Sequence, residues 1–127
     1  MKLGITGNTG KPGLWKPVAD LISFLKESSY PFVLHPELGL GLSHEGFEIE
    51  SESVARDLTD FLNQSDIVIS FGGDGTLLNT VYELGEHPIP ILGVNYGRLG
   101  FLAHVEQSEL TNRMHQLEKG DYQVEER

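Results

Sequence analysis

The chain has 127 residues and a formal net charge of −10, because 19 Asp and Glu outnumber 9 Lys and Arg. Its length favours a single domain. No run of about 18 apolar residues and no apolar signal segment is present, so we expect a soluble, cytoplasmic protein without a membrane partner. The lack of Cys excludes disulfides and thiolate metal sites. The acidic charge argues against nucleic-acid binding, although a small phosphorylated ligand is compatible with it.

Apolar periodicity predicts that strands and helices alternate along the chain. Short apolar runs predict strands at residues 2–6, 32–34, 67–71 and 89–94. Helical spacing of apolar residues predicts helices at 14–25, 54–63, 77–84 and 110–117. The glycine-rich and acidic stretch 37–51 is expected to form a long surface loop, and residues 121–127 to begin one more strand.

This alternation predicts an α/β fold, an open and mostly parallel sheet with helices on both faces. In such sheets ligands bind at the carboxyl ends of strands. The candidate loops therefore follow Thr6, Phe71 and Val94. The loop 7–13 lacks the spacing of a Walker A motif, so Lys11 is not a P-loop lysine, and neither this loop nor residues 39–44 match a Rossmann fingerprint.

The strongest candidate is the loop Gly72-Gly73-Asp74-Gly75-Thr76, which follows the strand 67–71. Glycines allow the backbone to turn sharply and to approach a ligand closely. The N–H groups that open the next helix favour anionic oxygens. A carboxylate at Asp74 could orient a hydroxyl, accept a proton or hold a divalent metal. The structural alternative is a tight turn in which Asp74 caps the helix.

A second glycine loop follows the strand 89–94 and runs from Asn95 to Leu102. The amide of Asn95 could bind a hydroxyl or a base edge, and Phe101 could form a wall for a flat base, with a place in the core as its alternative. Two such loops at adjacent strand ends would form one crevice. The five His residues are scattered and are expected to be structural or solvated.

Gly72-Gly73-Asp74-Gly75-Thr76, together with the segment from Gly93 to Leu102, resembles the NAD kinase family. The resemblance implies a transferase of NADP biosynthesis that moves the γ-phosphoryl group of ATP to the 2′-hydroxyl of the adenosine ribose of NAD, with a divalent metal, Mg²⁺. By this resemblance Asp74 is the proton acceptor, and Asp74, Gly75, Asn95 and Phe101 contact NAD. Gly72, Gly73, Gly75 and Thr76 would form the phosphate loop. No residue is assigned as a metal ligand.

The resemblance is to the N-terminal domain of that family. Residues 1–120 would be an α/β nucleotide-binding domain, and residues 121–127 would start a strand leading into a β-rich C-terminal domain absent from this chain. We therefore expect the chain to be inactive alone and the longer parent to be a homo-oligomer, a dimer or tetramer, whose partners are small nucleotides. One departure is Asn79, where many family members carry a basic residue.

Two alternatives use the same motif. One is the N-terminal domain of a diacylglycerol-type lipid kinase, which shares the Gly-Gly-Asp-Gly-Thr loop but follows the next strand with a different pattern. The other is a nucleotide-binding module without turnover. The choice of ATP or polyphosphate as donor, and of NAD or NADH as acceptor, is left open by the sequence.

Overall fold

The computed structural model describes residues 2–94, with Pro12, Asp74 and Leu77 described by their backbone alone. The strands in this range are β1 (Leu3–Gly7), β2 (Phe32–Leu34), β3 (Ile67–Phe71) and β4 (Ile91–Val94). The α helices are α1 (Trp15–Glu27), α2 (Pro36–His44), α3 (Leu58–Gln64) and α4 (Asp74–Leu84). Two short 3-10 helices are η1 (Pro12–Leu14) and η2 (Ser51–Ser53).

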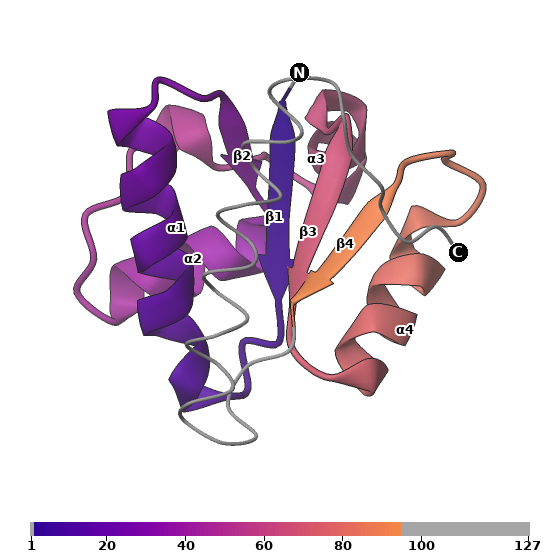
Figure 1. The fold of residues 1–127 in the computed structure, drawn as a ribbon, viewed down its shortest axis with the longest axis horizontal. Coiled ribbons are helices and arrows are strands. Elements are labelled where there is room, and N and C mark those ends of the chain that lie inside the picture. Colours follow the sequence, from indigo (N-terminus) through magenta and orange to yellow (C-terminus); the bar gives the residue numbers. More distant parts are fainter. Residues whose placement is uncertain (1, 95–127) are drawn as a thin grey trace.

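The described strands form one parallel sheet in the order β2-β1-β3-β4 (Figure 1). The chain moves from β1 outward to β2, then crosses back to β3 on the other side of β1 and continues to β4. The order of strands therefore reverses between β1 and β3. In parallel α/β sheets this reversal is the place where a ligand crevice opens.

Helices cover both faces of the sheet, because strand side chains alternate between two apolar layers. One layer packs against α1 and α2 and includes Leu3, Ile5, Ile67, Ile69 and Phe71. The other packs against α3 and α4 and includes Val33, Val68, Ile91, Phe61 and Leu84. Each fully buried side chain of this kind contributes roughly 1.5–3 kcal/mol. The predicted α/β class, with helices on both faces of a parallel sheet, is confirmed.

The surface loop predicted at residues 37–51 is wrong over its first half, because Pro36–His44 forms α2. The helix begins with strong start signals: the side chain of His35 caps it by accepting a hydrogen bond from the N–H of Glu37, and Pro36 occupies its first turn. Leu38 and Leu42 lie one turn apart and are both buried.

Gly39 and Gly41, whose low helix propensity favoured a loop at the sequence level, are needed for close packing of α2. A Cβ on Gly41 would collide with the ring of Trp15 on α1, and a Cβ on Gly39 would lie 2.7 Å from Val54 Cγ1. Each glycine costs the helix up to about 1 kcal/mol relative to Ala. Here tertiary contact outweighs that propensity, because only glycine lets α2 approach its neighbours this closely.

The helix expected at 54–63 begins later, at Leu58. Val54 instead forms a parallel bridge with Leu34, and Asp57 caps α3 by accepting a 2.8 Å hydrogen bond from the N–H of Asp60. The Asp60 carboxylate accepts from the backbone N–H of Arg56 and from the amide of Gln64, and these bonds hold the pKa of Asp60 below its ordinary value. That contribution to stability is lost as the pH falls through the lowered pKa.

Other boundaries differ by one to three residues. The strands predicted at 2–6 and 89–94 are Leu3–Gly7 and Ile91–Val94, the helix predicted at 14–25 is Trp15–Glu27, and the helix predicted from residue 77 already begins at Asp74. The helix at 110–117 and the strand at 121–127 lie outside the described residues. Within residues 2–94, no helix has the length and apolar character of a membrane span.

The close packing around Gly7 leads to a testable prediction about stability. A Cβ at this position would lie 2.7 Å from Leu14 Cδ1 and 3.0 Å from the carbonyl oxygen of Phe71, which belongs to the backbone and cannot move aside cheaply. Gly7→Ala is therefore expected to lower the free energy of unfolding by about 1–3 kcal/mol in urea denaturation. Gly75→Ala is the control, because a Cβ there meets nothing within 4 Å; equal destabilisation by both variants would contradict this role for Gly7.

Candidate functional site

A cleft of about 500 Å³ opens where the strand order reverses. Gly7 at the end of β1 lies opposite Phe71 at the end of β3, and the chain then leaves toward opposite faces of the sheet, into α1 and into α4 (Figure 1). One wall of the cleft is the segment from Thr6 to Lys11, and the other is the first part of α4, from Gly73 to Thr80. Glu37 of α2 completes the lining.

The wall after β1 is held in place by short hydrogen bonds. The N–H of Asn8 donates to the carbonyl of Phe71 at 3.1 Å, which ties the loop to the end of β3. The side-chain oxygen of Asn8 accepts from the N–H of Gly10 at 3.0 Å, an Asx turn that directs the chain toward Lys11. The loop therefore has a defined shape, and Lys11 lies at its end as an exposed cation.

At its start, around Gly73 and Gly75, the wall formed by α4 presents backbone rather than side chains. Gly72 has φ +156, and a Cβ there would collide with the side chain of Thr76, so the turn itself requires glycine. At Gly73 and Gly75 a Cβ would meet nothing within 4 Å. Packing within the described part of the chain does not explain these two glycines. They leave the first N–H groups of α4, which have no partner within the helix, accessible from the cleft.

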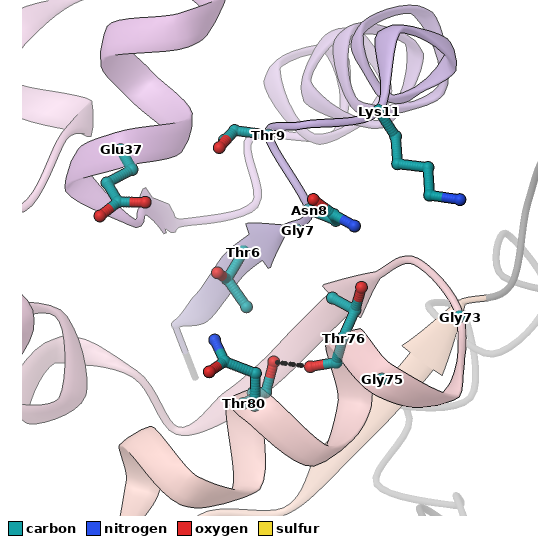
Figure 2. A pocket seen from close by; sticks show the side chains of 11 residues that line it. Thr6, Gly7, Asn8, Thr9, Lys11, Glu37, Gly73, Gly75, Thr76 and Thr80 are labelled. Carbon is teal, nitrogen blue, oxygen red and sulfur yellow. Dashed lines mark hydrogen bonds between the residues drawn. The ribbon is translucent and has the colours of Figure 1, made fainter.

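The first turns of α4 are anchored to β3 by buried hydroxyls. Thr80, only 4% exposed, donates to the carbonyl of Thr76 at 3.0 Å, as Figure 2 shows, and lies 2.9 Å from the hydroxyl of Ser70 on β3. These bonds fix the helix start relative to the strand end. Neither Thr80 nor Ser70 was predicted from the sequence. The signal for Thr80 was its place one turn after Thr76, on the side of the helix that faces the sheet.

Thr6 has a hydroxyl that no described residue satisfies. The residue is 6% exposed, lines the cleft, and its side chain has no hydrogen-bond partner within residues 2–94. Figure 2 shows it at the base of the cleft, between Glu37 and the helix that carries Thr76. Because the hydroxyl lines the cleft, it can donate a hydrogen bond to a ligand bound there or accept one from it.

The structure brings together part of the predicted site. Gly73, Gly75 and Thr76 line the cleft, and Gly72 forms the turn before it. The backbone of Asp74 stands at the start of α4. Asn95 and Phe101 lie outside the described residues. The loop after Thr6 was predicted as a candidate loop, but no residue in it was predicted as a site residue, because cleft residues on different segments are recognised only once the fold is known.

No group of three or more His, Asp or Glu side chains that could hold a metal occurs in the described part of the chain. Glu37 is the carboxylate that the structure shows lining the cleft. This donor set does not form a protein cage for a cation. Within residues 2–94 it would suit a Mg²⁺ that is held mainly by substrate phosphates and water, which is the usual mode for that ion.

The all-parallel sheet, the two helical layers and the glycine-lined cleft at the strand reversal define an α/β domain of the open, doubly wound type. A family model described as the ATP-NAD kinase N-terminal domain matches residues 3–122. The chain belongs to this family.

Individual relatives agree with this assignment. The chain is 37% identical over 125 residues to the NAD kinase of Heliobacterium modesticaldum, covering 98% of this chain and 41% of that protein. It is 37% identical over 128 residues to the NAD kinase of Bacteroides fragilis, covering 100% and 43%. The chain thus spans about two fifths of the length of these curated relatives.

The fold is similar to that of yeast NADH kinase, whose crystal structure was solved as a complex with NADH. The TM-score is 0.74 at 23% sequence identity, and the match covers 92% of this chain and 35% of the yeast chain. None of these comparisons favours a diacylglycerol-type lipid kinase.

The unsatisfied hydroxyl of Thr6 can be tested by Thr6→Val in the full-length protein that carries this domain. Valine has nearly the same shape and favours a strand, so the free energy of unfolding is expected to stay equal or to rise by up to about 1 kcal/mol. With ATP as a probe of the cleft in isothermal titration calorimetry, the affinity is expected to fall about 2–10-fold if the probe loses a hydrogen bond to this hydroxyl. Thr59→Val on the exposed side of α3 is the control. Unchanged affinity in Thr6→Val would exclude the hydroxyl as a ligand contact.

Proposed function

We propose that the full-length protein carrying this domain is an NAD kinase. It transfers the γ-phosphoryl group of ATP to the 2′-hydroxyl of the adenosine ribose of NAD, giving NADP and ADP. A bond forms between the ribose oxygen and the γ-phosphorus, the bond from that phosphorus to the β,γ-bridging oxygen breaks, and the hydroxyl proton passes to Asp74, the proposed acceptor. The observation that carries this proposal is the cleft at the strand reversal, where the motif Gly72–Thr76 opens α4 in a member of this family.

In this proposal the start of α4 binds phosphate. Its free N–H groups and the helix dipole favour anionic oxygens, and the glycines at 73 and 75 leave room for a close approach. Lys11 is the cationic side chain lining the cleft within residues 2–94. It would offset phosphate charge from the opposite wall, which matters here because position 79, basic in many family members, is Asn in this chain.

Asp74 is the proposed proton acceptor. Its backbone stands at the first position of α4, where the helix dipole favours a carboxylate. Phosphoryl transfer has a loose transition state, so its main role would be to orient the hydroxyl. Gly75 is proposed as a backbone contact to NAD. Asn95 and Phe101 are proposed contacts to the same substrate, on the basis of the family resemblance.

Mg²⁺ is the proposed metal, arriving on the phosphates of the donor. When bound it would neutralise phosphate charge. We assign no protein ligand to it, because the described residues offer no cluster for a cation. Because the chain is acidic, neutralising the phosphate charge would support binding of the nucleoside triphosphate as well as transfer of its γ-phosphoryl group.

The division of the protein is also proposed. Residues 1–120 would be the N-terminal nucleotide-binding domain, and residues 121–127 would lead into a β-rich C-terminal domain that supplies the rest of the nucleotide site. The support is that the chain spans about two fifths of its relatives. The chain alone would then be a nucleotide-binding module without turnover. A cytoplasmic homodimer or homotetramer is proposed for the full-length protein from the resemblance alone.

The role of Asp74 is tested by Asp74→Asn in the full-length protein. The formation of NADP from NAD and ATP, followed by a coupled NADP-dependent assay, is expected to fall about 10²–10⁴-fold because the proton acceptor is lost. The free energy of unfolding is expected to change by less than about 1 kcal/mol, since the substitution alters only the charge at a helix start.

Asp20→Asn is the control, because it removes the same charge from an exposed position on α1. It is expected to leave NADP formation unchanged. Turnover by Asp74→Asn above one tenth of the wild-type value would contradict the assignment of Asp74. Steady NADP formation by the purified 127-residue chain would contradict the proposal that it needs the rest of the protein.

A further inference from the structure

The cleft carries opposite charges on opposite sides. Figure 2 shows Glu37 of α2 on one side of the end of β1 and Lys11 on the other. The start of α4, with Gly73, lies on the same side of this view as Lys11, and both line the cleft, so the positive end of the helix dipole and the ammonium group favour an anion on that side. The base of the cleft between these sides holds the buried hydroxyl of Thr6.

Glu37 is positioned by the start of α2. Its N–H donates to Nδ1 of His35 at 3.2 Å, and His35 is 8% exposed. The imidazole packs against the ring of Phe61 with centroids 5.3 Å apart, and its Nε2 lies 3.6 Å from a carboxylate oxygen of Glu83 on α4. The backbone that carries Glu37 is therefore fixed from both α3 and α4.

The Glu37 carboxylate itself has no ion-pair or hydrogen-bond partner among the side chains that the structure describes. An ionised carboxylate only accepts hydrogen bonds. A ligand that reaches from the Lys11 side to the Glu37 side must therefore end in a group that donates hydrogen bonds. A second phosphate at that end would face a like charge.

We propose that Glu37, with the neighbouring hydroxyl of Thr6, recognises the hydrogen-bond donors of the donor substrate's nucleoside and thereby selects a nucleoside triphosphate over inorganic polyphosphate. This inference rests on the proposed function, because it concerns the phosphoryl donor of that reaction. The hydroxyls of a ribose and the amino group of a base can donate to the carboxylate. Inorganic polyphosphate carries anionic oxygens along its whole length and has neither ribose hydroxyls nor a base amino group.

The test compares ATP with inorganic tripolyphosphate, which share a chain of three phosphates and differ by the nucleoside. Both are titrated into the full-length protein by isothermal titration calorimetry at one fixed magnesium concentration. The wild-type protein is expected to bind ATP at least about tenfold more tightly. In Glu37→Gln the preference is expected to shrink to less than about threefold, mainly because tripolyphosphate binds more tightly once the repelling charge is gone.

Glu45→Gln is the matched control. It removes the same charge at the other end of α2. Both glutamates are exposed, but Glu45 lies outside the cleft, so the preference for ATP is expected to stay at the wild-type value. Glutamine keeps the size of the side chain, and thermal unfolding of each variant checks that the fold is retained.

An unchanged preference in Glu37→Gln, an equal loss in Glu45→Gln, or a wild-type protein without preference for ATP would each overturn the inference. The coupled NADP assay on the same samples tests the proposed function separately from the inference about Glu37. If NADP forms but Glu37→Gln leaves the preference for ATP unchanged, only the inference about Glu37 is overturned. If the preference for ATP depends on Glu37 but no NADP forms, only the proposed function is overturned.

Discussion

The parallel pairing of β1 with β3 is the contact on which the rest of the structure depends. It runs from Leu3 opposite Ile67 to Gly7 opposite Phe71, and it joins two strands whose following helices pack on opposite faces of the sheet. Because the chain diverges there, a cleft opens beyond the paired ends. Gly7 allows the strand ends and η1 to come this close.

Much of the sheet could be predicted from local sequence. The bounds of β3 and β2 match the predicted runs 67–71 and 32–34, because a continuous series of β-branched and aromatic residues fits a strand buried on both faces. The glycine motif after Phe71 was also recognisable, since three glycines in four positions have few purposes other than a sharp turn or a close approach. Local patterns therefore identified one wall of the cleft.

The other parts of the cleft could not be predicted in this way. The helix α2 was missed because Gly39 and Gly41 lower helix propensity, while their benefit lies in contacts with Val54 and Trp15 that only the folded chain shows. Glu37 was missed with it. Thr6 has the sequence context of an ordinary strand residue, and its unsatisfied hydroxyl becomes evident only from the packing around it.

The most direct measurement is a crystal structure of the full-length protein with a non-hydrolysable ATP analogue. If the cleft at the strand reversal binds the donor, its phosphates will lie within hydrogen-bond distance of the N–H groups of Gly73 and Gly75 and near the ammonium of Lys11. Phosphates bound elsewhere, for example in the groove between α2 and η2 that Leu40 and Ile49 line, would contradict it.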